Sequence, residues 1–315
     1  MIARAPAPAI SVVLCTLNRA AYLRTALQSL AEQAAPHPSF EVIVVDNGST
    51  DETPQVAAEF ARVLPLRHVV EPELGLCNAR NTGWRESRAR IVAYLDDDAV
   101  ALPEWLSGVC DAFSRGPDVG VAGGPIHPIW LAPRPGWLTD LTARALTIVE
   151  WPGGPRCIDD VRAEWLAGAN MAVPRAVLEA VGGFDPRLDR IGHNMLSNGD
   201  IHVQQMIVAR GLTAVYEPRM AISHAVPPDR LTQRWFRRRY YWQGISDSVM
   251  YHVERSPSTA QCLRDAVGHA AHLLRSPRRL RALVRRTDDA RTFEEQCMAL
   301  VQLGHIAGLI RVALR

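Results

Sequence analysis

The sequence predicts an α/β protein with a doubly wound, mostly parallel central sheet flanked by helices, followed by a helical C-terminal extension. Two observations predict this fold. In the first hundred residues, short β-branched apolar runs alternate with segments whose apolar residues recur at helical spacing. After residue 230 the chain is rich in leucine, alanine and arginine in helical patterns. Strands that alternate with helices are typical of a parallel sheet covered by helices.

Four strands and three helices are expected in the first half of the chain. The strands are predicted at 10–14, 40–45, 67–70 and 91–95, and the helices around 23–30, 53–62 and 78–87. In a doubly wound sheet, ligands bind beyond the carboxyl ends of the strands. The polar residues that follow these strands are therefore expected to share one site: Thr16, Asn18, Asp46, Asn47, Asp51 and Asp96 to Asp98.

The second half begins with an irregular excursion, because four prolines occur between Pro125 and Pro135. A helix is predicted at 201–210, a strand at 213–216, and helices over 231–314 with breaks at prolines. The chain is thus divided into residues 1–123, 124–230 and 231–315.

Composition points to an ordinary globular enzyme, with 48% hydrophobic and 22% charged residues. The six cysteines form no CxxC pair, which favours free thiols in a reducing compartment. The N-terminal apolar stretch is too short for a signal peptide, and no apolar run approaches the roughly 18 residues of a membrane span. We therefore expect a cytoplasmic protein. A nucleic-acid partner is not expected, because no recognition motif accompanies the arginines.

Three consecutive aspartates, Asp96-Asp97-Asp98, follow the fourth predicted strand. Carboxylates this close together raise one another's proton affinity unless a cation lies between them. Mg²⁺ or Mn²⁺ takes hard oxygen ligands and bridges to substrate phosphates, so one or two carboxylates suffice. A solvated acidic turn is the simpler alternative.

Two other enzyme classes use similar aspartates. Residues Asp96 to Val100 fit the DxDx[TV] pattern of haloacid-dehalogenase-type phosphatases, but those enzymes carry the motif on the first strand and need a later lysine. A metal-dependent nucleotidyltransferase should carry a glycine-rich loop after the first strand, and Cys15 to Arg19 contains no glycine. Neither class is favoured.

The ordered motifs of the first half resemble those of family 2 glycosyltransferases with the GT-A fold, over roughly residues 10–230. Ser11 to Arg19 is similar to that family's first strand and nucleotide loop, and Val44 to Asp51 to its second-strand signature. Gly75 to Gly83 resembles the segment that precedes the metal motif. The resemblance implies a donor-binding half at 1–123, an acceptor and catalytic-base half of the same domain at 124–230, and an arginine-rich extension at 231–315.

Carried over by position, the resemblance places Thr16 and Asp46 against the nucleobase and ribose, and Asp96 on the ribose side of the metal motif. Asp46 could instead simply initiate the turn that follows it. The implied donor-binding residues are Thr16, Asn18, Arg19, Asp46, Asn47, Asn78, Arg80, Asp96 and Asp97.

The resemblance assigns the metal to Asp98 and His224 and leaves the choice between Mn²⁺ and Mg²⁺ open. Inverting transfer also needs a base that stands apart from the metal. Asp200 matches that base, although an Asp at a helix start could equally be a cap. Gly199 stands where the family usually has Glu, so a donor- or carrier-binding pseudoenzyme remains an alternative.

The acceptor side of the resemblance covers Trp165, Gly168, Ala169 and Asn170, although a core tryptophan is equally consistent with this segment. Gln233-Arg234-Trp235 departs from the Q-x-x-R-W motif of processive synthases in its spacing. We therefore predict single, non-processive transfer from a nucleotide diphosphate sugar, with a UDP-sugar as the expected donor. The acceptor is a glycan, a lipid-linked glycan or a small molecule, with a carrier protein as a further option.

Two arginine clusters lie in the second half, at 237–239 and 275–286. The first could bind the donor diphosphate or solvate a helix face. The second lies among Leu274, Leu280, Leu283 and Val284, a pattern that fits a solvated helix, a peripheral membrane contact or an acidic carrier protein.

Overall fold

The computed structural model describes residues 7–191, 194–285 and 287–314 of the chain. It divides into two compact units, and each is described by itself. The sheet unit comprises Met1–Pro128, Val149–Pro186 and Gly199–Ala225, and the helical unit comprises Ile129–Ile148, Arg187–Asn198 and Val226–Arg315. Arg286, which belongs to the second predicted arginine cluster, lies outside the described residues.

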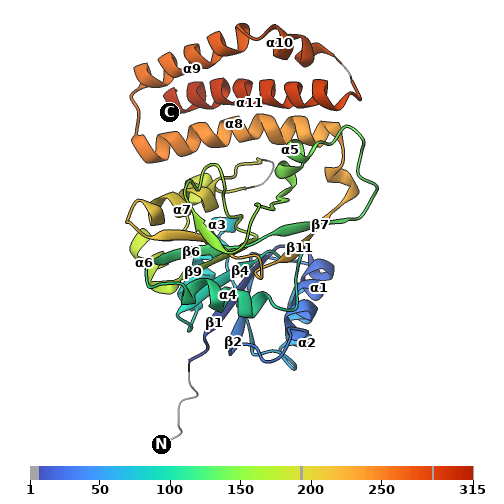
Figure 1. The fold of residues 1–315 in the computed structure, drawn as a ribbon, viewed down its shortest axis with the longest axis vertical. Coiled ribbons are helices and arrows are strands. Elements are labelled where there is room, and N and C mark those ends of the chain that lie inside the picture. The colour runs from blue at the N-terminus through green and yellow to red at the C-terminus, as the bar shows by residue number, and fades with distance from the viewer. Residues whose placement is uncertain (1–6, 192–193, 286, 315) are drawn as a thin grey trace, which may run out of the picture. The chain divides into compact units, whose positions relative to one another are not determined.

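An eight-stranded sheet forms the centre of the sheet unit (Figure 1), in the order β3-β2-β1-β4-β9-β6-β10-β8. The strands are β1 (Ile10–Thr16), β2 (Phe40–Asp46), β3 (Leu66–Val70), β4 (Ile91–Leu95), β6 (Val119–Gly123), β8 (Arg156–Ile158), β9 (Asn170–Pro174) and β10 (Thr213–Tyr216). β3, β2, β1 and β4 pair in parallel, whereas β9 runs antiparallel to both β4 and β6. The prediction of a mostly parallel sheet is confirmed.

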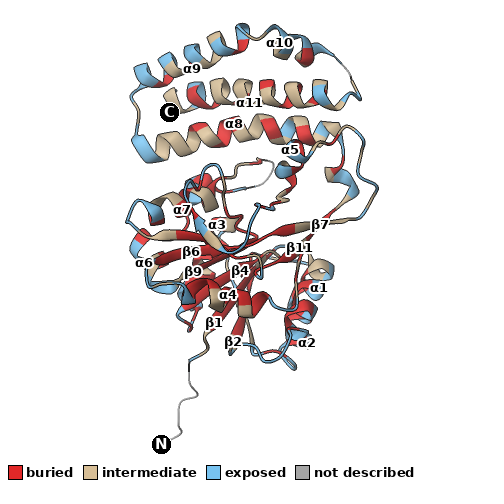
Figure 2. Ribbon diagram, viewed as in Figure 1, coloured by how far each residue is buried: buried red, intermediate tan, exposed pale blue. Residues whose placement is uncertain are grey.

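Helices pack against this sheet, as the alternating pattern predicts. They are α1 (Ala20–Ala31), α2 (Thr53–Phe60), α3 (Leu76–Glu86), α4 (Trp105–Ser114), α6 (Arg175–Val181) and α7 (Gly199–Val208). Figure 2 shows the inner strands as largely buried, because the apolar residues of β1, β2 and β4 lose nearly all exposure. α3 lies especially close to β1, since a Cβ at Gly83 would clash with Val13.

The parallel register of β1 and β2 brings the expected functional residues to one edge. Thr16 is paired with Asp46, so both strands end at the same level. β4 lies on the other side of β1 and ends at Leu95, directly before the three aspartates. The carboxyl ends of three neighbouring strands therefore converge.

A second, three-stranded sheet has the order β5-β11-β7, formed by β5 (Ala99–Ala101), β11 (Ile222–Val226) and β7 (Ile126–Trp130). β7 lies where the prolines predicted an irregular excursion. Pro128 is accommodated because β7 is an edge strand, and such a strand tolerates a residue without an N–H group. The antiparallel register pairs His224 with Ala99, which places His224 beside Asp98.

The helical unit contains α5 (Asp140–Ala143), α8 (Gln233–Arg255), α9 (Thr259–Leu274), α10 (Pro277–Val284) and α11 (Ala290–Ala313). In Figure 1, α11 lies between α8 on one side and α9 with α10 on the other. Residues 129–148 join this unit, because Leu138, Ala143 and Leu146 pack into one apolar cluster with Phe236 and Phe293. The division of the structure thus differs from the boundaries at 123 and 230.

α8 and α11 make backbone contact through glycines. A Cβ at Gly304 would clash with the carbonyl oxygen of Tyr241, and one at Gly244 would clash with that of Val301. α11 is the one helix among the described residues that is long and apolar enough, by length and composition, to cross a membrane. Here it packs against α8 and α9.

Candidate active site

The aspartate triplet begins directly after β4 and is tied to the end of β1. The Thr16 hydroxyl donates a hydrogen bond of 2.7 Å to Asp97 Oδ2. Asp97 and Asp98 are buried, whereas the side chain of Asp96 keeps about a third of its exposure. The predicted donor-binding residues Thr16, Asp96 and Asp97 and the predicted metal ligand Asp98 therefore lie together.

Arg19 bridges the two buried carboxylates. Its Nη1 donates to Asp97 Oδ1 at 3.0 Å and to Asp98 Oδ2 at 2.8 Å. Burial alone would lower the pKa of Arg19, but the carboxylates of Asp97 and Asp98 outweigh burial and raise this pKa above its ordinary value. Arg19 therefore stays charged and acts as the counter-ion of the triplet.

One guanidinium group does not fully balance this cluster. Burial, opposed by Arg19 and reinforced by Asp98, raises the pKa of Asp97 to about 6. Because burial is the largest cause, this raised pKa mainly reflects the loss of water around the carboxylate, and a cation bound beside it would favour the charged form. The electrostatics of the triplet favour a further cation.

His224 meets the triplet from β11. Its Nε2 lies 3.1 Å from Asp98 Oδ1, and both side chains are buried. The backbone supports this pair, because the N–H group of Ala225 donates to the carbonyl oxygen of Asp98 at 2.9 Å. The Nδ1 atom of His224 is buried with no hydrogen-bond partner in the part of the chain that the structure describes.

The donor set of this pocket fits a divalent metal held in part by substrate. Among the described residues no three His, Cys, Asp or Glu side chains form a metal cluster. Asp98 and His224 do form an adjacent carboxylate and imidazole pair, which suits Mn²⁺ or Mg²⁺ completed by water and donor phosphates. The orphaned Nδ1 of His224 and the excess of negative charge in the three aspartates over Arg19 are consistent with that assignment.

A second arginine links the triplet to the expected base. Arg80, from α3, lies 3.3 Å from Asp96 Oδ1 through its Nη2 and packs over the ring of Phe184. Burial alone would lower the pKa of Arg80, but Asp96 and Asp200 outweigh it and raise this pKa. Arg80 is thus held between the two carboxylates by charge.

Asp200 is the second residue of α7 and is fixed by two backbone groups. The N–H group of Gly168 donates to its Oδ2 at 2.8 Å, and that of Ile201 donates to its Oδ1 at 2.9 Å. Asp200 therefore lies inside the first turn, two positions beyond the residue that precedes the helix, and it keeps partial exposure. An anionic side chain in a first helical turn is also stabilised by the helix dipole.

Gly199 departs from the resemblance for a local reason. It is buried, and a Cβ there would lie 3.1 Å from the Sγ atom of Cys77. A longer side chain would have to displace Cys77. With Cys77 in this position, glycine fits at residue 199, and Asp200 is the acidic residue in the first turn of the helix.

Asp46 has one carboxylate oxygen in a turn and one facing a histidine. Its Oδ1 accepts from the N–H group of Ser49 at 2.7 Å, and its Oδ2 lies 3.3 Å from His68 Nε2. The turn role that the sequence left open is present in the structure. His68, from β3, was not predicted, because a histidine within an apolar strand gives no signal of its own.

Three of the predicted donor-side asparagines are engaged with loops. Asn47 donates to the carbonyl oxygens of Glu71 and Glu73 and accepts from the N–H group of Gly75. Asn18 accepts from the N–H group of Thr50 at 2.7 Å, and Asn78 donates to the carbonyl oxygen of Leu74 at 3.3 Å. In this structure these side chains position the loops around the site.

The predicted acceptor segment runs beside the triplet, because β9 pairs with β4. The carbonyl oxygen of Ala169 accepts from the N–H group of Asp96 at 3.2 Å, and Gly168 is needed because a Cβ there would lie 2.6 Å from the Arg80 guanidinium. Trp165 is half-buried against the core. Asn170 is fully buried and is bound to Trp105 Nε1 and to the carbonyl oxygen of Met220, which gives it a structural role.

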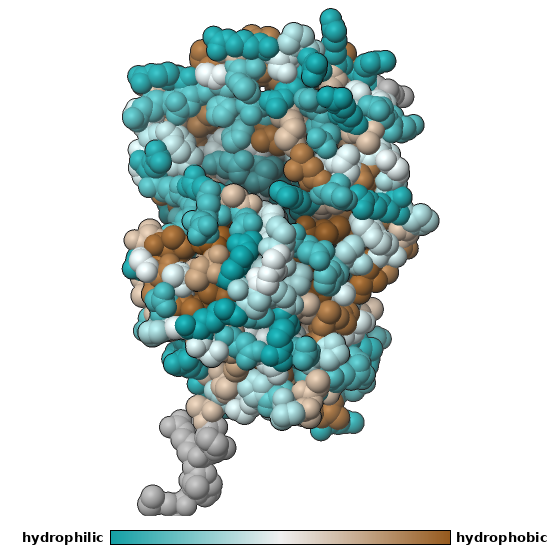
Figure 3. Space-filling view, viewed as in Figure 1, coloured by the Kyte–Doolittle hydropathy of each residue, from teal (hydrophilic) through white to brown (hydrophobic). Residues whose placement is uncertain are grey.

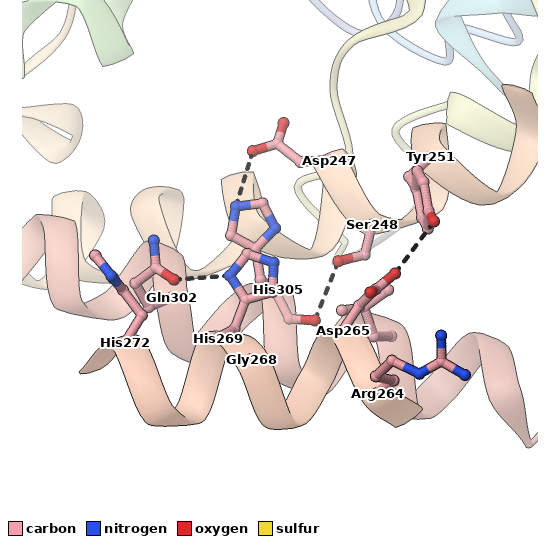
Figure 4. A pocket seen from close by; sticks show the side chains of 11 residues that line it. Asp247, Ser248, Tyr251, Arg264, Asp265, Gly268, His269, His272, Gln302 and His305 are labelled. Atoms are coloured by element: carbon pink, nitrogen blue, oxygen red, sulfur yellow. Dashed lines mark hydrogen bonds and ion pairs between the residues drawn. The ribbon is translucent and has the colours of Figure 1, made fainter. Parts of the chain in front are cut away.

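A separate pocket of about 650 Å³ lies within the helical unit (Figure 4). Its rings of His269 and His305 stack at 4.5 Å, and His305 Nε2 lies 3.5 Å from Asp247 Oδ2. Tyr251 donates to Asp265 at 3.1 Å. Because these polar side chains interact with one another, the residues that line the pocket help to hold α8, α9 and α11 together.

Sequence comparison finds relatives of this chain among known glycosyltransferases. Residues 11–152 match the family model described as glycosyl transferase family 2. Glucosyl-dolichyl phosphate glucuronosyltransferase from Haloferax volcanii is 26% identical over 257 residues, which cover 76% of this chain and 77% of that protein. Validoxylamine A glucosyltransferase from Streptomyces hygroscopicus subsp. jinggangensis is 39% identical over 107 residues, 33% of this chain and 25% of that protein.

Solved structures share the fold at low sequence identity. The mannosyltransferase PcManGT from Pyrobaculum calidifontis, in complex with GDP-Man and Mn²⁺, has a TM-score of 0.55 and 21% identity, covering 98% of this chain and 87% of that one. TarS 1–349 from S. aureus in complex with UDP has a TM-score of 0.54 and 16% identity, covering 96% and 91%. Residues 11–152, somewhat less than half of the chain, thus match family 2 glycosyltransferases in sequence, and the structure shares the GT-A fold of the solved glycosyltransferases.

Proposed function

We propose that this enzyme transfers a single sugar, with inversion, from a nucleotide diphosphate sugar to a hydroxylated acceptor. The observation that carries the proposal is the separation of two acidic centres by Arg80. Asp98 and His224 form a cation-binding pair at the triplet, whereas the partly exposed Asp200 is anchored at Gly168. One centre suits the departing diphosphate and the other suits deprotonation of the acceptor.

In this mechanism the protein holds the donor at the edge formed by β1, β2 and β4. Thr16 and Asp46 face the nucleoside, and Asp96 faces the ribose. Asp200 accepts the proton of the attacking acceptor hydroxyl on the face of the sugar opposite the diphosphate, which inverts the anomeric centre in one displacement. The Gly168 N–H group keeps the carboxylate in place for that step.

Asp98 and His224 would hold the divalent metal. When bound, the metal neutralises the charge that develops on the departing nucleoside diphosphate. Arg19 supplies the counter-charge to the triplet when the donor is absent. Mn²⁺ is the more suitable ion because imidazole is among the ligands it accepts.

A UDP-sugar is the proposed donor. TarS and GalNAc-T7, which share the fold, were each solved with UDP, although PcManGT holds GDP-Man. The named relatives act on a dolichyl phosphate-linked sugar and on a small molecule, which supports a lipid-linked, glycan or small-molecule acceptor. The cytoplasmic location and a carrier-bound acceptor stay predictions.

Non-processive transfer is supported by the helical unit. Gln233 donates to the carbonyl oxygen of Thr287 at 2.7 Å and accepts from Arg237 at 2.6 Å. Arg237 also donates to Gln296 and packs over Phe293. Gln233 and Arg237 are therefore engaged in holding helices together.

Thermal stabilisation by a panel of UDP-, GDP- and dTDP-sugars, with and without Mn²⁺, tests the donor site. A cognate donor at about 100 times its Kd should raise the unfolding free energy by about 2.7 kcal/mol. This gain should need the metal and should be lost in His224→Gln. Stabilisation that is independent of metal and unchanged in His224→Gln would refute the assignment of the cation-binding pair.

Product analysis tests the stereochemistry separately. With a donor from the panel and a candidate acceptor, the anomeric proton of the product should show the configuration opposite to that of the donor. Retention of configuration would contradict single displacement by a hydroxyl that Asp200 activates.

A further inference from the structure

We propose that the outer surface of α9 and α10 docks on an anionic lipid bilayer. This basic apolar surface consists of exposed Leu263, Val267, Leu274 and Val284 together with Arg264, Arg275, Arg278, Arg281 and Arg285. It lies entirely within the helical unit, on α9, on α10 and on the residue that directly follows each of these helices. The proposal does not depend on which sugar or acceptor the enzyme uses.

The apolar part is a stripe along α9. Leu263, Val267 and Leu274 are spaced by four and seven residues, which places them on one helical face. All three are exposed, while Cys262, Ala266 and Leu273 face the unit's interior. α9 is therefore apolar on two faces, and only one of them is covered by the protein.

The basic part flanks this stripe. Arg275 follows α9 directly, and α10 presents Arg278 and Arg281 as exposed side chains, with Arg285 at its end. Arg279 is excluded from this set because it pairs with Glu295. The only acidic residue within α9 or α10 is Asp265, which accepts a hydrogen bond from Tyr251. Asp289, just before α11, interacts electrostatically with Arg285, so the positive charge of the surface is offset in part at that end.

Apolar and basic residues are adjacent here, as they are in interfacial helices. Val284 is 85% exposed and lies between Arg281 and Arg285 in the sequence. Figure 3 shows hydrophobic surface among hydrophilic side chains over the α9 and α10 layer. An interfacial helix buries such an apolar stripe at the acyl boundary while its arginines contact anionic headgroups.

Charge argues for lipid over a second copy of this chain. In a symmetric dimer the same patch faces itself, so the arginines of two copies would be brought together. Like charges opposed in this way are unfavourable. An anionic bilayer complements both the arginines and the apolar stripe.

Vesicle co-sedimentation of the full chain tests the proposal. Vesicles of phosphatidylcholine with about one third phosphatidylglycerol should bind the protein, pure phosphatidylcholine should bind it weakly, and high salt should weaken binding. The triple variant Arg275→Gln, Arg278→Gln, Arg281→Gln should bind roughly a hundredfold less tightly, at about fivefold per arginine.

A matched variant controls for net charge. Arg62→Gln, Arg88→Gln, Arg90→Gln removes the same charge from exposed positions of the sheet unit and should bind anionic vesicles as the wild type does. For the stripe, Val267→Ser should weaken binding and Val63→Ser should not, although their exposures match at 69% and 70%. Each variant is first required to melt at the wild-type temperature.

Three results would overturn the proposal: equal binding to neutral and anionic vesicles, equal losses in the two triple variants, or no loss in either. Light scattering provides a further arm. If the protein dimerises and the Arg275, Arg278 and Arg281 triple variant changes the dimer without changing vesicle binding, the surface is an interface between copies and the proposal is wrong.

Discussion

At the scale of single residues, two arginines that differ in burial contribute positive charge to the candidate donor site. The side chain of Arg19 is 37% exposed and contacts Asp97 and Asp98. The side chain of Arg80 is 7% exposed and interacts electrostatically with both Asp96 and Asp200. Four carboxylates thus face two guanidinium groups. The two remaining negative charges are those that one divalent cation would neutralise.

Replacing Arg19 tests this charge balance. Arg19→Gln should lower the unfolding free energy by about 1–3 kcal/mol, less than for a fully buried pair because solvent screens the exposed guanidinium. Mn²⁺ should then restore more thermal stability to the variant than it adds to the wild type. The exposed pair Arg24 and Glu59 provides the control, and Arg24→Gln should leave the unfolding free energy close to that of the wild type. If Mn²⁺ stabilised the wild type and Arg19→Gln equally, this result would contradict the idea that Arg19 and the metal both neutralise the three aspartates.

The lowered pKa of His305 predicts that the helical unit loses stability as the pH falls. Burial, opposed by Asp247 and reinforced by His269, lowers the pKa of His305 from its ordinary value. The unfolded chain therefore binds more protons between that lowered pKa and about 6.5. Stability from neutral His305 is fully present above about pH 6.5 and is lost as the pH falls through this window.

Melting temperatures from about pH 7.5 down to about pH 5 measure this effect. His305→Gln should show a shallower decline than the wild type, whereas exposed His37→Gln should follow the wild type. A decline in His305→Gln as steep as that of the wild type would assign the acid sensitivity to other groups.

Residue types near the triplet were predictable from sequence, but their partners were not. Asp46 and Asp96 could be predicted as site residues because each stands where a run of buried apolar strand residues stops. Nothing in local sequence indicates that Arg19 contacts Asp98 or that Arg80 lies between Asp96 and Asp200. Those contacts depend on how β1, α3 and α7 meet, which only the tertiary structure provides.

At the scale of elements, the sequence signal was strong where periodicity was regular. The predicted strands at 40–45 and 91–95 agree closely with β2 and β4. α4 was not predicted, and it contains Gly108, a residue that weakens helical signals. Gly108 is there because the helix approaches the backbone at Arg219 and Met220, where a Cβ would lie 2.6 Å from the Arg219 carbonyl carbon.

Two glycines of the helical unit test whether close approach explains their presence. Gly304→Ala should destabilise the unit by about 1–3 kcal/mol or more, because the added methyl would clash with the α8 backbone at Tyr241. Gly268→Ala, in the open middle of α9, should stabilise it by about 0.5–1 kcal/mol. Chemical denaturation of both variants gives the two signs, and a stabilised Gly304→Ala would contradict the packing described for α8 and α11.

At the scale of the whole molecule, the proposed transfer site and the proposed lipid-binding surface belong to different units. The sheet unit holds every side chain that the proposed transfer uses, from Thr16 to His224. The helical unit is assembled from three separate segments of the chain, which is why a linear division at 123 and 230 does not describe it. Its first and last segments are joined by the apolar contacts of Leu138 and Leu146 with Phe236 and Phe293, a long-range pairing that sequence periodicity does not encode.

The central claim is that Asp200 deprotonates the acceptor without holding the donor. Asp200→Asn tests it most directly, because the amide oxygen can still accept from the Gly168 N–H group while the basic carboxylate is lost. Asp140→Asn, at an exposed position of the helical unit, serves as the control.

The measurement is the turnover of Asp200→Asn alongside its thermal stabilisation by the cognate nucleotide sugar and metal. We predict that transfer falls by a factor on the order of 10²–10⁴, while stabilisation by the donor stays at the wild-type value. Wild-type turnover in Asp200→Asn, or loss of donor stabilisation together with transfer, would contradict the role of Asp200 as the base.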